Sequence, residues 1–442
     1  MVLTINFNFK EIKNLIYLLI YGIIALLIIC HTKRPELHIV LIWGMAILAV
    51  VICKLQIVHP YFWFSISFSL YSTAYTILYV MGFGIYGYDS ENLFLSTLSL
   101  LTSLLVIGSK RVDINSFPKN KIHIPSETLE IIITFLSLLC LFCTILLSQK
   151  GYSGKVEMKK AQDFNYRIAT YLSRFICTFL MIYFCEYLSS KKYRSKFKNL
   201  IIVILNSGIS IIYFTLITGE RDATLRFLLL FFMSLFVYNK LKSYHALILL
   251  PFGIWIMVFS VYIKYFFSRG ILNNSYLSFN NIISNFLQTD FHSSGMNLQY
   301  LLENSWTESS QGIQLLFAEM LTPFLPSGII FNPDQWFNYV VHSGKYHGYA
   351  FSLVGTGYII GGRIGVVLLF FIVGLMCRHL YKNSIKDVYN MVSYICMISA
   401  FIASFRSSAG SIYTSYVRTI LIPIIFCKFI IPDIRFISGK LL

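Results

Sequence analysis

Charged residues are scarce in this 442-residue chain. Asp, Glu, Lys and Arg together make up 12% of it, whereas 57% is hydrophobic. A typical soluble protein carries about twice that share of charge. The scarcity excludes an ordinary soluble domain and is typical of a polytopic membrane protein. Acidic residues are the scarcer kind, with 19 Asp and Glu against 36 Lys and Arg, so the formal net charge is +17.

A basic excess can indicate nucleic-acid binding. However, no basic stripe with interleaved aromatics stands outside the apolar runs, so we predict no nucleic-acid partner. Lys and Arg instead gather on the cytoplasmic loops of membrane proteins, which explains the excess more simply.

Patterns for disulfide, metal or covalent chemistry are also missing. All nine cysteines lie in apolar runs, and the CxxC spacing of Cys140 and Cys143 has no partner pair, which favours packing over metal binding. HxxEH, DxD and nucleophile-elbow patterns are absent, as are paired acidic ligands, so we predict neither a metal nor a cofactor. No cleavage signature follows the first apolar run, Leu15–Cys30, so we expect it to be a retained membrane helix.

Runs long enough to cross a bilayer are abundant. A spanning helix needs roughly 20 mostly apolar residues. Twelve stretches approach that criterion: 14–30, 37–57, 61–83, 93–108, 128–148, 168–189, 199–218, 225–239, 246–266, 352–377, 388–405 and 415–432. We therefore predict an all-α polytopic membrane protein with about 12 transmembrane helices, forming a single membrane domain over residues 1–442.

One long interval interrupts this series. Residues 1–266 hold nine runs, 267–350 hold none and 351–442 hold three. Within the interval, 278–289 and 311–324 repeat apolar residues at i, i+3, i+4 and i+7, which predicts two amphipathic helices. Such helices lie flat on the membrane surface or cap the helix bundle, and we expect Phe286 and Phe317 to dock them.

The distribution of Lys and Arg predicts orientation. With the N-terminus inside, the cytoplasmic connections are short and rich in basic residues, most densely at Lys191–Lys198. Both termini are then cytoplasmic, and the long loop 267–350 is extracytoplasmic.

Several arginines nevertheless fall on the outer side, among them Arg226, Arg363 and Arg418. Arg167 and Arg174 are seven residues apart and share one helical face. An arginine within a span usually faces a cavity or a partner, and guanidinium groups suit phosphate. The alternatives are snorkelling to lipid phosphates and pairing with Asp163, Glu220 or Asp222. The candidate phosphate-binding set is Arg167, Arg174, Arg221, Arg269 and Arg406.

Acids and histidines of the long loop are candidates for a general base. They are Asp290, His292, Glu319, His342 and His347. A lone residue of this kind is more often a solvated surface residue than a base, and no catalytic spacing joins these five.

A short motif resembles a known family. Thr218-Gly219-Glu220-Arg221 is similar to the small-Gly-x-Arg sequence that ends an outward-running helix in bacterial polysaccharide repeat-unit polymerases, the Wzy-type O-antigen polymerases. The stretch 348–365 resembles that family's return from its long outer loop, and the likeness extends to the whole topology. Many members carry a Glu before the Tyr of this second pattern, whereas this chain has Gly355, Thr356 and Gly357 nearby. Only Arg221 is carried over, as a lipid-pyrophosphate contact.

The resemblance implies a GT-C-like glycosyltransferase of the bacterial inner membrane. It would transfer a growing glycan from undecaprenyl pyrophosphate onto a new lipid-linked repeat unit, producing O-antigen of lipopolysaccharide or capsule, with a chain-length regulator as a further partner. Two rivals are a lipid-linked oligosaccharide flippase, for which two similar halves are expected, and a glycan ligase of similar architecture. A membrane acyltransferase needs a histidine within a span, for which His38 is a poor candidate.

Overall fold

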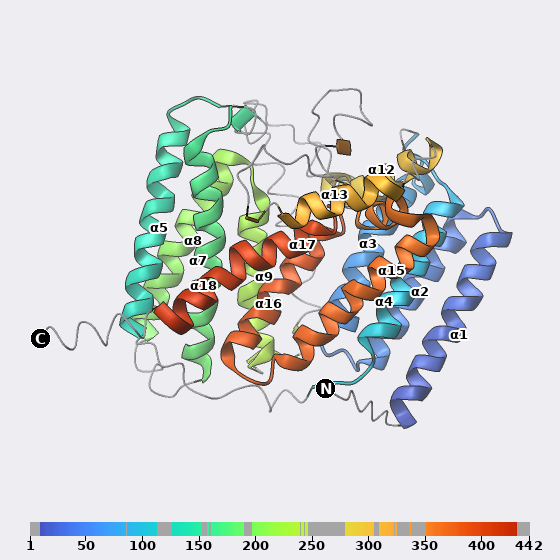
Figure 1. Ribbon diagram of the computed structural model, residues 1–442, viewed down its shortest axis with the longest axis horizontal. Coiled ribbons are helices and arrows are strands. Elements are labelled where there is room, and N and C mark those ends of the chain that lie inside the picture. Colours follow the sequence, from blue (N-terminus) through green and yellow to red (C-terminus); the bar gives the residue numbers. More distant parts are fainter. Residues whose placement is uncertain are drawn as a thin grey trace, which may run out of the picture. The chain divides into compact units, whose positions relative to one another are not determined.

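The structure is a computed structural model that describes residues 9–84, 86–112, 126–152, 157–158, 161–189, 197–238, 240–242, 244–245, 279–304, 309–321, 323–324, 336–337 and 351–430. Every regular element in these ranges is a helix (Figure 1). Eight helical segments are long and apolar enough to cross a membrane. The prediction of an all-helical polytopic membrane protein is confirmed, whereas the number of spans and the GT-C likeness stay predictions.

Eleven of the twelve predicted spans coincide with described helices, and 246–266 lies outside the described residues. The helices are α1 (Phe9–His31), α2 (Pro35–Ile52), α3 (Pro60–Val80), α4 (Ser90–Ile107), α5 (Ser126–Ser148), α7 (Phe164–Ser189), α8 (Phe197–Thr218), α9 (Arg221–Val237), α15 (Leu353–Asn383), α16 (Val388–Ser404) and a final run of α17 (Gly410–Ser415), η6 (Tyr416–Leu421), α18 (Ile422–Ile425) and η7 (Phe426–Ile430). Three of them fall outside the eight candidate spans, because α3 is rich in Ser, Thr and Tyr and because α9 and α16 have 17 residues each.

The chain divides into two compact units, each assembled from separated segments. The first unit comprises Met1–Val112, Phe279–Lys382 and Ala400–Thr414. The second comprises Asp113–Ser278, Asn383–Ser399 and Ser415–Leu442. Both units therefore cut across the sequence-based segments 1–266, 267–350 and 351–442.

An aromatic core holds the first unit together. Phe68 of α3 stacks on Phe64 one turn earlier, with ring centroids 5.9 Å apart, and meets Phe370 of α15 and Phe405 edge-on at 5.5 and 5.3 Å. The same helix buries hydroxyl groups, which donate to carbonyls one turn back, as Thr73 does to Ser69 at 2.6 Å. This local bonding lets a polar helix lie inside a membrane protein.

The second unit is tied by polar side chains between its helices. The carboxylate of Glu130 on α5 accepts a hydrogen bond from the Tyr183 hydroxyl of α7 at 2.8 Å and one from the Asn199 amide of α8 at 3.2 Å. The Ser210 hydroxyl of α8 donates to the Ser137 carbonyl of α5 at 2.7 Å. Interhelical hydrogen bonds of this kind fix helix partners in a bilayer, where apolar faces alone discriminate little.

A sharp kink interrupts α15 and corrects the prediction of one continuous span over 352–377. Gly361 (φ −172°, ψ 37°) and Gly362 (φ 57°, ψ −138°) leave the helical conformation. Beyond them the chain turns back, so that a Cβ on Gly365 would lie 2.2 Å from the Gly357 carbonyl oxygen. Eight residues of straight helix would separate the two positions by about 12 Å. The segment is therefore two helical halves packed against each other.

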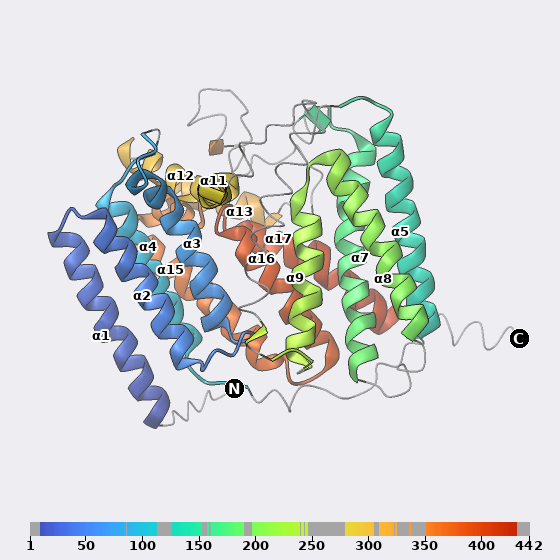
Figure 2. The same cartoon turned by 180° about the vertical axis from the view of Figure 1, so that it is seen from behind.

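Both predicted loop helices are present. The first comprises α11 (Phe279–Phe286), η4 (Leu287–Phe291) and α12 (His292–Glu303), so it continues well past the predicted end at residue 289 (Figure 2). It lies on α3 and α4, where the Asn92 amide donates to the Gly295 carbonyl at 2.8 Å. The second is α13 (Ser309–Leu321). The Phe317 side chain is 62% exposed, so the expectation that it docks α13 on the helix bundle is wrong.

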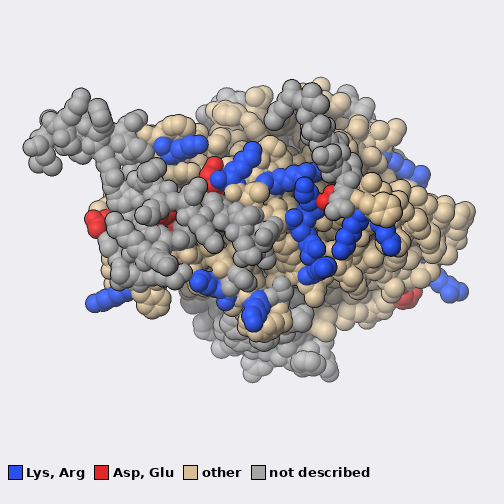
Figure 3. All heavy atoms as spheres, turned by 90° about the horizontal axis from the view of Figure 1, so that it is seen from below, with Lys and Arg blue, Asp and Glu red and all other residues tan. Residues whose placement is uncertain are grey.

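Figure 3 shows Lys and Arg side chains of the described residues from below. In the first unit, Lys110 follows α4 while Arg378 and Lys382 lie in the last turns of α15, close enough to one another to interact electrostatically. Such clustering is expected of a cytoplasmic face. The side of the membrane itself stays a prediction.

Candidate anion-binding site

Asp163 determines where α7, the helix with two of the candidate arginines, begins. One carboxylate oxygen accepts hydrogen bonds from the backbone amides of Asn165 and Tyr166 at 2.9 and 3.2 Å, which caps the helix. The other accepts from the Lys150 ammonium at 2.5 Å and from the Tyr152 hydroxyl at 3.1 Å. Burial by itself would raise the pKa of the Asp163 carboxyl, but these hydrogen bonds outweigh burial and the pKa is lowered.

A polar stripe follows along α7. Arg167, Tyr171, Arg174 and Thr178 recur at i, i+4, i+7 and i+11, and α7 is helical throughout this range, so the four residues share one face. The predicted common face of Arg167 and Arg174 is therefore present. All four positions lie in a candidate membrane span, where polar side chains usually face a partner or a cavity.

The last helical run of the chain covers part of this stripe. The Arg418 guanidinium of η6 donates a hydrogen bond to the Tyr171 hydroxyl and lies 5.6 Å from the centre of its ring. One residue later, the Thr419 carbonyl accepts from the Thr178 hydroxyl at 2.7 Å. A π-helical segment thus adds a third arginine to the α7 face, and π-helical turns are common at functional sites.

A further cation comes from α9. Arg226 lies close enough to Arg174 for the two guanidinium groups to repel each other, and both lie near the Cys177 side chain. Asp222, one turn before Arg226, attracts it. Both side chains are half-buried. Two like charges held together there are costly, and an anion bound between them would remove that cost. The arginine pair is therefore a candidate for binding an anion.

A buried carboxylate is connected to Arg174 through one tyrosine. The turn between α8 and α9 contains Gly219 at φ 71°, a conformation that glycine adopts readily, followed by Glu220, which is 8% exposed. The Tyr166 hydroxyl donates to the Glu220 carboxylate at 3.0 Å. Tyr166 also interacts electrostatically with Arg174, so it links the carboxylate to the arginine pair.

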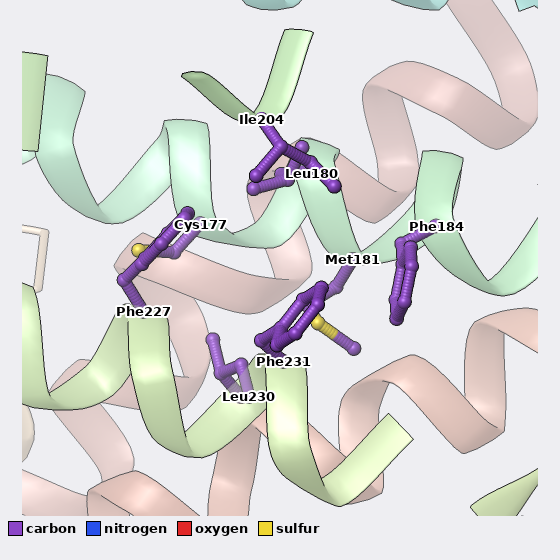
Figure 4. Close-up of a pocket in the computed structure, with 8 residues that line it drawn as sticks. All are labelled: Cys177, Leu180, Met181, Phe184, Ile204, Phe227, Leu230 and Phe231. Carbon is purple, nitrogen blue, oxygen red and sulfur yellow. The ribbon is translucent and has the colours of Figure 1, made fainter. Parts of the chain in front are cut away.

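An apolar groove begins next to the arginines. Side chains of α7, α8 and α9 point towards one another around a shallow groove whose free volume, about 10 Å³, is close to that of one water molecule (Figure 4). They are Cys177, Leu180, Met181, Phe184, Ile204, Phe227, Leu230 and Phe231. Cys177 belongs to this lining and also neighbours Arg174 and Arg226, so the cations mark one end of the groove.

The remaining arginines of the candidate set are not joined to this pair by any described contact. Arg221 is the first residue of α9, and its side chain lies outside the described atoms. Arg269 lies outside the described residues altogether. Arg406 belongs to the first compact unit, whereas Arg167 and Arg174 belong to the second.

The general-base candidates also remain apart from the arginines within the described contacts. His292 begins α12 in the first unit, with its ring 5.5 Å from that of Tyr86. Asp290 and Glu319 lie in η4 and α13, but the structure describes only their backbone. His342 and His347 lie outside the described residues.

Arg363 has a structural explanation. It binds Glu91 of α4 through two hydrogen bonds of 2.8 and 2.7 Å and lies 4.7 Å from the centre of the Phe94 ring. Ion pairing therefore explains this arginine, although its partner is Glu91 and none of the three predicted acids; its side chain is 59% exposed.

Three residues of this candidate site, Arg226, Arg418 and Glu220, have no functional role in the sequence-based predictions. Arg226 and Arg418 stood among the outer arginines without a role, and Glu220 was considered only as an ion-pair partner. A sequence signal for this site is the spacing of Arg221 and Arg226, which lie five residues apart just before an apolar run.

Comparisons with protein-family models, curated proteins and solved structures found no match. The resemblance carried by Thr218–Arg221 therefore rests on the sequence alone.

Proposed function

We propose that this protein is a membrane glycosyltransferase that polymerises undecaprenyl-pyrophosphate-linked oligosaccharide repeat units in a bacterial cytoplasmic membrane. The observation that carries the proposal is the pair Arg174–Arg226 at one end of an apolar groove, with the buried Glu220 carboxylate linked to it through Tyr166. A polyprenyl pyrophosphate has the matching parts, an anionic head and a hydrocarbon chain.

The proposed reaction uses each part. An acceptor sugar hydroxyl attacks the anomeric carbon of the donor glycan, the carbon–oxygen bond to pyrophosphate breaks, and the hydroxyl proton passes to a carboxylate. Guanidinium groups stabilise the charge that develops on the departing pyrophosphate. Glu220 is the base in this scheme, because it is a buried carboxylate that the Tyr166 hydroxyl connects to Arg174. The products are the elongated lipid-linked glycan and the free carrier pyrophosphate.

The direct test uses purified protein in liposomes with lipid-linked repeat units, followed by sizing of the glycans on a gel. Wild-type protein is expected to produce a ladder. Glu220→Gln is expected to lose roughly a hundredfold or more of its turnover, because general-base catalysis contributes about 10²–10⁴-fold. Glu91→Gln is the matched control, since it makes the same change in an acid of the other unit that pairs with Arg363.

Deletion of the gene provides the test in cells. A strain without the polymerase is expected to retain glycans of a single repeat unit. Loss of all surface glycan, together with transport of lipid-linked units by the purified protein, would instead identify a flippase. Transfer of finished glycan to a different acceptor would identify a ligase.

A further inference from the structure

The exposed face of α13 is apolar. Its large exposed side chains are Ile313, Phe317, Met320 and Leu321, with the exposed Gln314 beside them, and Phe324 just beyond the helix extends the face. The exposed fractions of these side chains lie between 40% at Met320 and 66% at Phe324. Contiguous large apolar side chains are rarely left in water, because each one is costly to hydrate. Something apolar therefore covers this face.

The opposite face of α13 is already packed against protein. A Cβ on Gly312 would lie 2.8 Å from both the Ile359 carbonyl carbon and the Ile360 amide nitrogen, so α13 presses directly onto the backbone of α15. Leu315 is buried in a cluster with Leu301, Phe337 and Phe351. The orientation of α13 about its own axis is thus determined, and its more apolar side points away from the first unit.

Where α13 meets α15 indicates what covers that side. The contact at Ile359–Ile360 immediately precedes the kink and lies within the candidate membrane span Leu353–Asn383. The first turns beyond the kink expose Ile364 (73%) and Leu368 (57%), the pattern of a helix that faces lipid. Along α15, the contact with α13 therefore lies next to the first side chains that face lipid, Ile364 and Leu368.

We propose that the exposed face of α13 lies in the bilayer, against lipid acyl chains, and anchors the loop between α12 and α15 to the membrane surface. Interfacial helices bury an apolar face at the boundary between headgroups and acyl chains. Phe317 and Ile313 would then face hydrocarbon, while Gly312 and Leu315 hold the helix on the first unit. The proposal is independent of the proposed enzymatic function.

Spin labels in the full-length protein measure whether the exposed face of α13 is surrounded by lipid or by water. Cys30 is the one exposed cysteine of the nine, so a Cys30→Ser background leaves only buried thiols. Single nitroxide labels are placed at Phe317→Cys and Met320→Cys, on the exposed face of α13. Two further labels calibrate the scale: Leu368→Cys reports on lipid, and Asn304→Cys, exposed at the end of α12, reports on water. The protein is reconstituted in vesicles of phosphatidylethanolamine and phosphatidylglycerol.

Relaxation of each label by oxygen, which concentrates in lipid, is compared with relaxation by a water-soluble nickel complex. We expect the ratio of relaxation by oxygen to relaxation by nickel to be similar for the labels at 317, 320 and 368. All three ratios should be severalfold higher than the ratio for the label at 304. Labels that behave like the one at 304 would overturn the proposal. Labels shielded from both reagents, with spin–spin broadening between molecules, would also overturn it and identify a second copy of the chain as the covering partner.

Discussion

At the scale of single residues, the proposed pyrophosphate contact predicts that Arg174 contributes to turnover and little to stability, because Arg174 and Arg226 repel each other within the second unit. We expect Arg174→Gln to leave the thermal unfolding midpoint of the substrate-free protein unchanged or higher. Its polymerisation turnover should fall roughly ten- to a hundredfold, since one charge-assisted contact contributes about 1.5–3 kcal/mol. Turnover with lipid-linked repeat units and unfolding of the purified variant measure the two effects.

Arg363→Gln is the matched control, because it removes an arginine whose exposed ion pair contributes only about 0–1 kcal/mol. Arg174→Lys separates charge from geometry, and we expect partial impairment because lysine lacks the bidentate fork. Normal polymerisation by a folded Arg174→Gln protein would return this arginine to the snorkelling alternative.

The sequence predicted part of this site for a clear reason. Arg167 and Arg174 stand on one helix, so the helical period alone places them on one face. The hydrogen bond between Tyr166 and Glu220 joins residues 54 positions apart, and the approach of Arg226 to Arg174 joins two helices. Side-chain pairs between helices depend on how the helices pack, which periodicity does not determine.

At the scale of elements, the start of α7 depends on Asp163. Asp163→Ala removes the cap, and we expect a loss of about 0.5–2 kcal/mol in unfolding free energy. Asp163→Asn keeps an oxygen that can cap the helix but removes the charge that pairs with Lys150. Thermal unfolding of both variants in detergent separates the two contributions.

The same residue predicts a pH dependence. The pKa of Asp163 is lowered in the folded protein, so its charge stabilises the fold above the ordinary aspartate pKa of about 3.9. That stabilisation is lost as pH falls through the lowered folded-state pKa. The unfolding midpoints of wild type and Asp163→Asn should therefore differ at neutral pH and converge in acid. A constant difference across this range would show that the Lys150 pair contributes nothing.

The kink of α15 allows a test with neighbouring glycines. Gly362 has φ 57° and ψ −138°, a conformation in which a side chain is strained, whereas Gly361 is extended at φ −172°. A Cβ meets no atom within 4 Å at either position. We expect Gly362→Ala to cost about 1–3 kcal/mol of stability through backbone strain alone. Gly361→Ala should unfold like wild type, and equal loss in both variants would contradict this account of the kink.

The loop helices show that hydrophobic periodicity predicts where a helix forms but not which of its faces contacts protein. The amphipathic pattern correctly predicted a helix over 311–324, since α13 covers most of it. It predicted the wrong side for docking, because Phe317 points outward while Gly312 packs against α15. In a bilayer the solvent is itself apolar, so the more apolar face of a helix is not necessarily the one that meets protein.

At the scale of the whole molecule, the side of the membrane on which each connection lies is open to measurement. Reporter fusions after Lys196 and Lys382 are expected to be cytoplasmic, because Lys and Arg concentrate in those connections. A fusion at Asn304 is expected to be extracytoplasmic. A cytoplasmic signal at Asn304 would exclude polymerisation of exported glycans, since the loop would then face the wrong compartment.

The division of the first unit among distant segments has a consequence for biosynthesis. The hydrogen bond from Asn92 to the Gly295 carbonyl joins positions 203 residues apart. A ribosome adds roughly 5–20 residues per second, so Asn92 waits about 10–40 seconds for its acceptor. Throughout that interval α3 and α4 stand in the membrane without α12, which is their partner in the finished protein. The nascent chain is then most open to proteases and to wrong helix pairings, and slower translation ahead of residue 295 would lengthen its exposure.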